Sequence, residues 1–232
     1  MNSAANTAVT PTPNPRRNTL PGAVLWDMDG TIVDTEPYWI EAETALITSH
    51  AGTWTTEQAH QLVGNNLLDS AEILIRQGVR MPAEEIIDHL VAEVERRAQV
   101  EVPWRPGARE LLAELTAAGI PNVLVTMSYR SLARAVAAHL PAGTFAHLVA
   151  GDDVARGKPH PEPYLRAAEL IGLPPGECVA IEDSPSGVRS AAAAGVPVVA
   201  VEYLVPLGQI APAPVVHTLD GVRPADLLSL AG

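Results

Sequence analysis

Hydrophobic residues gather in short runs along the chain, and the first run follows a polar N-terminal stretch. Residues 23–26 read Ala-Val-Leu-Trp, a continuous apolar run that predicts a short buried strand. The run ends in Asp27 and Asp29, followed by Gly30 and Thr31. Residues i and i+2 of a strand point the same way, so we expect both carboxylates to face one site where the strand ends. Two buried acids are costly without a cation, so this pattern favours a divalent metal site.

The next part of the chain, up to residue 100, predicts only helices. A helix-start signal, with acids in the first turn and a proline near the beginning, occupies 34–37 and predicts a helix over 38–50. Thr55 and Gln58 have the spacing of a capping box before a short helix that we expect to reach Val63. Apolar residues at helical spacing predict two further helices, over 67–77 and 82–100.

Beyond Gly107 the pattern alternates between helices and strands. Helices are predicted over 108–118, 131–140, 164–171, 186–194 and 224–230, and strands over 122–126, 145–150, 178–181, 198–201 and 215–217. Such alternation predicts an α/β fold with a parallel, doubly wound sheet. Ligands bind at the carboxyl ends of the strands in such sheets. Polar residues stand at several of these ends, namely Asp27, Asp29, Thr126, Ser128, Glu182 and Asp183.

Composition narrows the class of protein. The chain has 232 residues, 47% of them hydrophobic, which suits one large α/β domain or one domain with an inserted module. Its net charge of −12 argues against general binding to nucleic acid. No apolar run approaches about 18 residues, so no membrane span is expected. We expect a cytoplasmic protein, a monomer or weak homodimer, with a flexible tail over residues 1–21.

Lys158 stands out by its rarity. The chain has 15 basic residues, and Lys158 is the single lysine among them. Lysine is a compact ammonium on a thin stem, whereas arginine is a wide planar fork. The single lysine has two explanations. The composition of the chain has shifted from lysine to arginine and one lysine has remained, or position 158 requires an ammonium group.

The candidate residues suit magnesium and phosphoryl chemistry. Carboxylates with oxygen-only ligands suit a hard ion such as Mg²⁺, and the chain has no Cys/His pattern typical of zinc and no Gly-rich nucleotide loop. An aspartate beside Mg²⁺ and Lys158 is a competent nucleophile toward phosphorus. The second carboxyl, two residues further on, can protonate the leaving oxygen and then deprotonate a water molecule.

Four short segments, in this order, resemble the motifs of the haloacid dehalogenase (HAD) superfamily. They are Asp27-Met28-Asp29-Gly30-Thr31, Thr126 after a strand, Gly157-Lys158-Pro159, and Glu182-Asp183-Ser184. The helices between the first two motifs resemble the helical cap of that superfamily. The resemblance covers roughly residues 22–232. It implies a Rossmann-like core, formed by 22–34 and 104–232, with an inserted all-helical cap over 35–103.

The resemblance also implies roles for individual residues. Asp27 would be the nucleophile, and Asp29 would be the general acid and base and would give Mg²⁺ its backbone carbonyl. Asp183 would hold Mg²⁺ together with Asp27, with Glu182 either a second acid ligand or its support. The substrate would be bound by phosphate-binding residues of the core and by side chains of the cap, namely Gly30, Thr126, Met127 and Lys158, and Trp39, Asn65 and Asn66.

Among the branches of the superfamily, the chain most resembles the β-phosphoglucomutase-like sugar-phosphate phosphatases. Asp29 is present, which favours phosphoryl transfer over carbon–halogen cleavage. The mutase has a histidine where this chain has Trp39, and an arginine where the cap loop reads Gly64-Asn65-Asn66-Leu67. These departures favour a Mg²⁺-dependent phosphatase that acts on a small metabolite, such as a sugar or polyol phosphate, through an aspartyl phosphate. The alternatives are a phosphomutase and a non-catalytic HAD-like binding protein.

Overall fold

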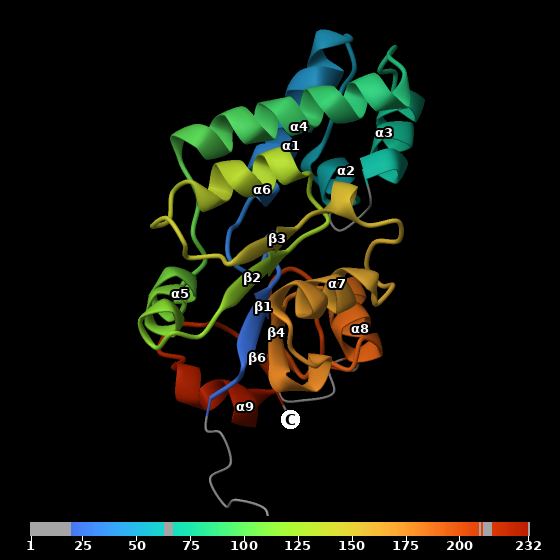
Figure 1. The fold of residues 1–232 in the computed structure, drawn as a ribbon. Coiled ribbons are helices and arrows are strands. Elements are labelled where there is room, and N and C mark those ends of the chain that lie inside the picture. The colour runs from blue at the N-terminus through green and yellow to red at the C-terminus, as the bar shows by residue number, and fades with distance from the viewer. Residues whose placement is uncertain (1–19, 63–66, 209, 211–214, 232) are drawn as a thin grey trace, which may run out of the picture.

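A computed structural model describes residues 20–62, 67–208, 210 and 215–231. Most of the predicted tail, residues 1–19, lies outside the described part. The fold is a parallel sheet flanked by helices, with a helical layer above the carboxyl ends of its strands (Figure 1).

Within the described residues the sheet has six strands, which are parallel and have the order β3-β2-β1-β4-β5-β6. This is the strand order of a Rossmann-like, doubly wound fold, so the predicted fold class is confirmed. The central strand β1 pairs with β2 on one side and with β4 on the other. The strands are β1 (Ala23–Trp26), β2 (Asn122–Val125), β3 (His147–Val149), β4 (Cys178–Glu182), β5 (Val198–Val201) and β6 (Val215–Val216).

Alternating side chains of β1 belong to two separate cores, as the period of a strand requires. Val24 and Trp26 pack with helices α5 (Ala108–Ala117) and α9 (Leu227–Leu230). Ala23 and Leu25 pack on the opposite face, with helices α7 (Glu162–Ile171) and α8 (Pro185–Ala193). Because both faces are covered, β1 is entirely apolar and fully buried, and its first polar residues appear where it leaves the sheet.

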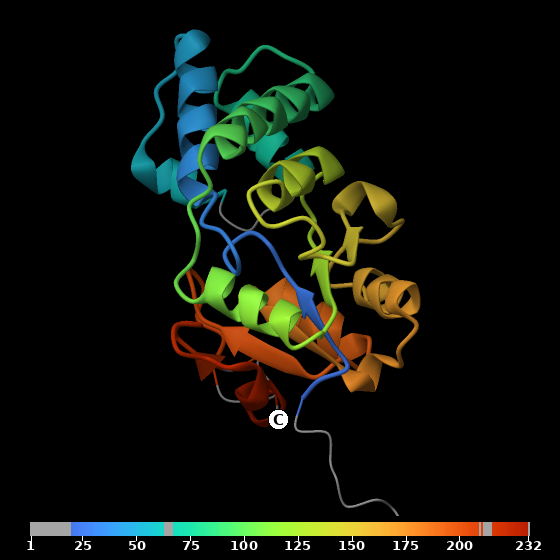
Figure 2. The same cartoon turned by 60° about the vertical axis from the view of Figure 1, so that its left-hand side comes forward.

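Helices α1 (Glu36–Ser49), α2 (Thr56–His60), α3 (Leu67–Arg76) and α4 (Ala83–Val100) lie between β1 and α5 in the chain. They form the helical layer, and α6 (Arg130–Ala137) packs against α4 from the core (Figures 1 and 2). The chain enters and leaves this layer through two adjacent segments. The backbone N–H of Asp34 donates to the carbonyl of Pro103 at 2.8 Å, and Val33 forms an antiparallel bridge with Trp104.

The predicted elements are present, with differences at their ends. The capping box at Thr55 and Gln58 is confirmed, with both of its hydrogen bonds formed. Helix α2 ends at His60, whereas Val63, its predicted last residue, lies outside the described part. The predicted strand over 145–150 is shorter, because only 147–149 pair with β2. The last helix begins with a 3₁₀ turn, Pro224–Asp226.

None of the helices within the described residues combines the length and the apolar character needed to cross a membrane.

Candidate active site

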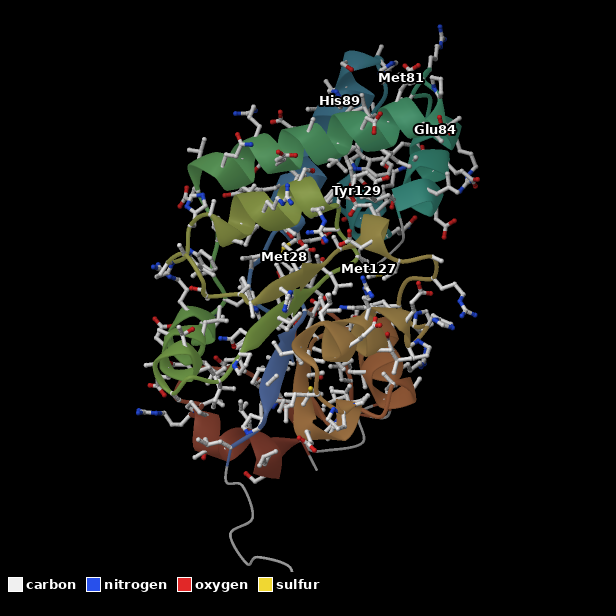
Figure 3. The ribbon with its side chains drawn as sticks, viewed as in Figure 1. Met28, Met81, Glu84, His89, Met127 and Tyr129 are labelled. Carbon is white, nitrogen blue, oxygen red and sulfur yellow. The ribbon has the colours of Figure 1, made fainter. Side chains whose placement is uncertain are left out.

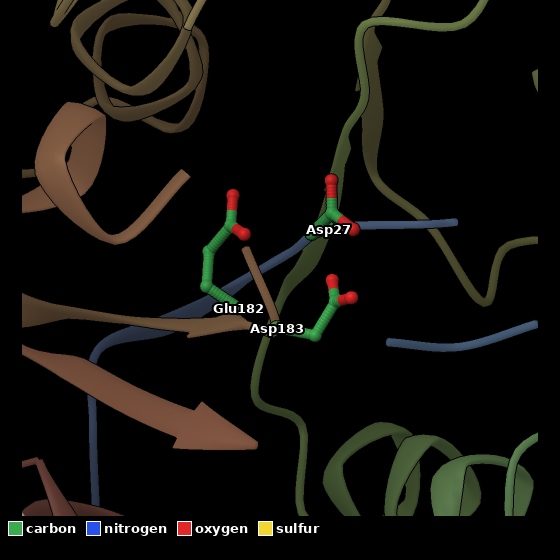
Figure 4. A group of neighbouring side chains, drawn as sticks. All are labelled: Asp27, Glu182 and Asp183. Atoms are coloured by element: carbon green, nitrogen blue, oxygen red, sulfur yellow. The ribbon is translucent and has the colours of Figure 1, made fainter. Parts of the chain in front are cut away.

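The carboxyl ends of β1 and β4 bring three buried acids together. Asp27 follows β1, Glu182 is the last residue of β4, and Asp183 follows it. Each of the three carboxylates has one oxygen atom that lies within 4.8 Å of an oxygen atom of each of the other two (Figure 4). The strand register explains the meeting, because Trp26 pairs with Ile181, so that Asp27 and Glu182 come next on neighbouring strands.

Lys158 neutralises part of this charge. Its Nζ lies 2.5 Å from Oδ1 of Asp27 and 2.6 Å from Oε1 of Glu182, and it donates to the carbonyl of Val125 at 2.9 Å. The side chain of Lys158 is 4% exposed. Burial alone would lower the pKa of Lys158, but the carboxylates of Asp27 and Glu182 outweigh burial and raise it. The single lysine of the chain is therefore buried beside Asp27, where the two carboxylates favour its ammonium form.

Three acids and one ammonium leave an excess of negative charge. Burial raises the pKa of Asp27 well above its ordinary value, against the lowering effect of Lys158. Burial and the charge of Glu182 raise the pKa of Asp183 to about 7. Such shifts indicate that a further cation is needed to keep these carboxylates ionised. The donor set consists of oxygen atoms, so it fits a divalent hard ion held by Asp27 and Asp183.

The carboxylate of Glu182 is bonded to several groups of the protein. Besides Lys158, it accepts a hydrogen bond from the hydroxyl of Tyr164 at 2.6 Å and a longer one, 3.3 Å, from Ser184. A Cβ at Gly187, in the first turn of α8, would overlap its carboxylate. Of the two roles expected for Glu182, these contacts favour support of Lys158 over direct ligation of a metal.

Asp29 lies among hydroxyl groups. Thr35 donates to its Oδ1 at 2.5 Å, and Ser128 donates to its Oδ2 at 2.7 Å. The hydroxyl of Thr126 is 3.3 Å from the same Oδ2 and accepts a hydrogen bond from the backbone N–H of Ser128. Asp29 thus has a setting different from that of Asp27, with neutral donors in place of an ammonium.

Gly30 allows the first and fourth motifs to approach each other. Its φ is +88°, and a Cβ there would overlap the carboxylate of Asp183. The hydroxyl of Thr31 donates to Oδ1 of Asp183 at 3.0 Å and fixes its orientation. A side chain at position 30 would therefore displace an acid that the proposed metal needs.

A cavity of about 380 Å³ opens between the core and the helical layer, and Asp29, Gly30, Trp39 and Asp183 are among its lining residues. Trp39, which is predicted to bind the substrate, lines this cavity. Met127 lies against the loop of Lys158, whose backbone N–H is 3.2 Å from the Met127 sulfur. Figure 3 places Met28 and Met127 near the carboxyl ends of the strands, with Tyr129 beneath α4. Asn65 and Asn66 lie outside the described residues.

Sequence reasoning missed two residues of the site. The sequence pattern assigns Thr35 only to a helix start and Tyr164 only to the start of a helix. Tyr164 is fully buried, and its ring centroid lies 5.3 Å from Nζ of Lys158. Thr35 lies six residues after Asp29, and no local pattern marks either Thr35 or Tyr164 as part of the site.

Fold and site define a doubly wound α/β protein with an aspartate and lysine centre at the carboxyl ends of its strands, and comparison with known proteins identifies its family. A family model described as haloacid dehalogenase-like hydrolase matches residues 21–195. Hexitol phosphatase A of Escherichia coli is 35% identical over 191 residues, 76% of this chain and 81% of that protein. The phosphoglycolate phosphatase of Xylella fastidiosa is 30% identical, over 81% of this chain and 82% of that protein.

A crystal structure of CbbY from Rhodobacter sphaeroides in complex with phosphate has the same fold. It is 25% identical, with a TM-score of 0.80, over 90% of this chain and 99% of that chain. The chain belongs to the haloacid dehalogenase-like hydrolase family. Because both of these curated relatives are named as phosphatases, it falls among the phosphoric monoester hydrolases of that family.

Proposed function

We propose that the protein is a Mg²⁺-dependent phosphatase that hydrolyses a small sugar- or polyol-like phosphate through an aspartyl phosphate on Asp27. The observation that carries the proposal is the contact between Nζ of Lys158 and Asp27, inside a cluster of acids with unbalanced negative charge. The relationship to Hexitol phosphatase A supports the substrate class.

The metal site would comprise Asp27, Asp183 and the backbone carbonyl of Asp29. Bound Mg²⁺ would neutralise charge on the phosphoryl oxygens and favour the ionised form of Asp27. Lys158 would bind a phosphoryl oxygen, together with Thr126 and the backbone near Gly30 and Met127. Glu182 would hold Lys158 in position.

Asp27 and Asp29 would divide the chemistry. A carboxylate oxygen of Asp27 attacks phosphorus, the ester P–O bond breaks, and Asp29 donates its proton to the departing alkoxide oxygen. Asp29 then removes a proton from a water molecule, which attacks the same phosphorus and breaks its bond to Asp27. Inorganic phosphate leaves and both side chains return to their initial states. The hydroxyls around Asp29 would position its carboxyl for both transfers.

We further propose that residues 35–103 act as a cap that closes over the substrate, with 22–34 and 104–232 as the core. The adjacent crossings at Asp34 and Pro103 suit a hinge, because few backbone bonds join the two parts there. Trp39 lines the cavity, and a mutase of this type has a histidine at the same position of the sequence. The absence of that histidine here favours release of phosphate over its transfer back to a sugar.

Purified protein assayed with Mg²⁺ against sugar phosphates, polyol phosphates and nucleotides tests the proposal. We expect release of inorganic phosphate from at least one sugar or polyol phosphate, without an isomeric sugar phosphate among the products. Formation of such an isomer would support the mutase alternative. No phosphate release from any of these esters, with the protein folded, would contradict the proposal.

A further inference from the structure

Tyr203 contacts both of the segments that connect the helical layer to the core. It belongs to the loop that follows β5. Its hydroxyl donates to Oδ1 of Asp34 at 2.6 Å, in the segment that leads into α1. The guanidinium of Arg105, in the segment that returns from α4, lies over its ring, with Cζ 4.0 Å from the ring centroid. One core residue therefore holds the two crossings through its side chain, by a hydrogen bond on one and a cation–π contact on the other.

The hydrogen bond between Tyr203 and Asp34 is of a strong kind. A hydroxyl that donates to a carboxylate forms a shorter and stronger bond than two neutral groups do. Burial, and then the bond to Asp34, raise the pKa of Tyr203, so the phenol keeps the proton that it donates. Within the described residues, no other side chain donates a hydrogen bond to the carboxylate of Asp34. Tyr203 therefore sets the orientation of that carboxylate.

Asp34 is connected to Asp29 through the residue that follows it. Thr35 comes directly after Asp34, and its hydroxyl donates to Oδ1 of Asp29 at 2.5 Å. The turn that precedes Asp34 is closed by its own backbone, because the N–H of Gly30 donates to the carbonyl of Val33 at 2.7 Å. A displacement of Asp34 would therefore move Thr35, and with it the hydroxyl that holds one oxygen of Asp29.

Tyr203 has a competing role, because it also lines the cavity that Asp29 lines. A side chain in that position could bind the substrate directly. The two roles have different consequences. A contact with the substrate would act without Asp34, whereas an effect on Asp29 requires the bond to Asp34. The contacts of the hydroxyl favour the second role, since its proton is donated to Asp34.

We propose that Tyr203 is a positioning residue for the proton transfers of Asp29, and that it acts through Asp34 and Thr35. The proposal rests on the proposed phosphatase function and adds a residue of the loop after β5 to its mechanism. Asp29 would give its proton to the leaving oxygen, so a misplaced Asp29 slows the release of poor leaving groups most. The alkoxide of a sugar or polyol needs that proton, whereas p-nitrophenolate is a stable anion and leaves without it.

The test compares two esters by kcat/KM, which covers the steps up to release of the leaving group. They are p-nitrophenyl phosphate and the sugar or polyol phosphate that the wild type hydrolyses fastest. In Tyr203→Phe we expect kcat/KM to fall roughly tenfold for the sugar or polyol ester and to stay within about twofold for p-nitrophenyl phosphate. A loss of folded protein would lower both values equally, so the ratio of the two reports on Asp29.

Tyr38→Phe is the matched control, because it removes a tyrosine hydroxyl that bonds a backbone carbonyl. The hydroxyl of Tyr38, on α1, is 3.3 Å from the carbonyl oxygen of Glu101. We expect the ratio of the two kcat/KM values in Tyr38→Phe to stay within about twofold of the wild-type ratio.

A double-mutant cycle separates positioning of Asp29 from contact with the substrate. Asp34→Ala removes the acceptor of the Tyr203 hydroxyl, and we expect the same change in the ratio as in Tyr203→Phe. Tyr203→Phe added to Asp34→Ala should then cause little further change, because the two residues act as a unit. Asp34→Ala alone gives the comparison of the two esters if Tyr203→Phe fails to fold, and a cycle with Thr35→Val replaces the first one if Asp34→Ala fails.

Three results would overturn the inference. They are unchanged kinetics in Tyr203→Phe, equal losses on both esters in that variant, and a full further loss when Tyr203→Phe is added to Asp34→Ala. In each of them the wild type still releases phosphate, so the proposed function survives. A folded wild type that releases phosphate from no ester would instead overturn the proposed function, and the inference with it.

Discussion

The hydroxyl of Thr35 donates a hydrogen bond to Oδ1 of Asp29 at 2.5 Å, and Thr35 is the residue immediately before α1. The proposed acid and base is therefore joined directly to the start of the helical layer. Movement of α1 relative to the core would change the setting of Asp29, so closure of the proposed cap would be coupled to the proposed proton transfer.

Replacement of Thr35 tests that coupling. Thr35→Val keeps the shape of the side chain and removes its hydrogen bond to a carboxylate, a loss of about 1.5–3 kcal/mol. We expect kcat to fall at least roughly tenfold, because each 1.36 kcal/mol is tenfold in rate. Thr44→Val is the control, since the Thr44 hydroxyl bonds only the carbonyl of Ile40 within α1. Equal kcat values for the wild type and Thr35→Val would contradict the role.

The close contact between Gly187 and Glu182 predicts a site-specific effect of one methyl group. In Gly187→Ala the new Cβ would overlap the carboxylate that holds Lys158. We expect a loss of stability of about 1–3 kcal/mol and a fall in kcat on the order of 10²-fold from displacement of Lys158. Gly176→Ala is the control, because its Cβ would meet only the carbonyl of Gly195 at 3.9 Å. Similar steady-state kinetics for the two variants would count against support of Lys158 by Glu182.

Glu43 predicts a pH-dependent stability. Its pKa is about 8 in the folded protein against an ordinary 4.5, so the folded state retains a proton that the unfolded chain has released between these values. The stability contributed by this proton is complete below about pH 4.5 and is lost as pH rises toward 8, with a slope of up to about 1.4 kcal/mol per pH unit. Urea unfolding of Glu43→Gln should therefore show a stability advantage over the wild type that grows between pH 5 and pH 8. An advantage that is constant over this range would show that Glu43 is ionised in the folded protein.

Removal of the divalent ion should abolish activity and lower stability. We expect chelation with EDTA to stop phosphate release and Mg²⁺ to restore it. Mg²⁺ should also raise the melting temperature of the wild type, because it binds the folded state and relieves repulsion among the buried acids. In Asp183→Asn the rise in melting temperature should be much smaller. Full activity in EDTA, after dialysis, would rule out the proposed metal dependence.

The residues that could be identified from sequence are those marked by an abrupt change of pattern. Asp27 and Asp29 end an apolar strand, Asp183 follows another, and Lys158 is the single lysine of the chain. The alternation of strands and helices predicts the doubly wound sheet. The capping box is predicted by the spacing of Thr55 and Gln58, which bond each other. These signals are local, so one sequence is enough to detect them.

The contacts that sequence could not supply depend on the packing of distant segments. Tyr164 contacts Glu182 because α7 covers the face of the sheet where β4 ends, and nothing within α7 indicates this. Glu43 is a charged residue, so its type favours an exposed position, and only the structure shows that it is buried. Glu182 itself was predicted with two roles, and only its contacts with Lys158 and Tyr164 favour one of them.

The central claim is that Asp27 attacks phosphorus, and Asp27→Asn tests it most directly. The amide keeps the size of the side chain but is not a competent nucleophile. With a phosphate ester that the wild type hydrolyses, we predict that phosphate release by Asp27→Asn falls at least about 10⁴-fold, while its melting temperature shows that it remains folded. Turnover at the wild-type rate by the folded variant would contradict the account.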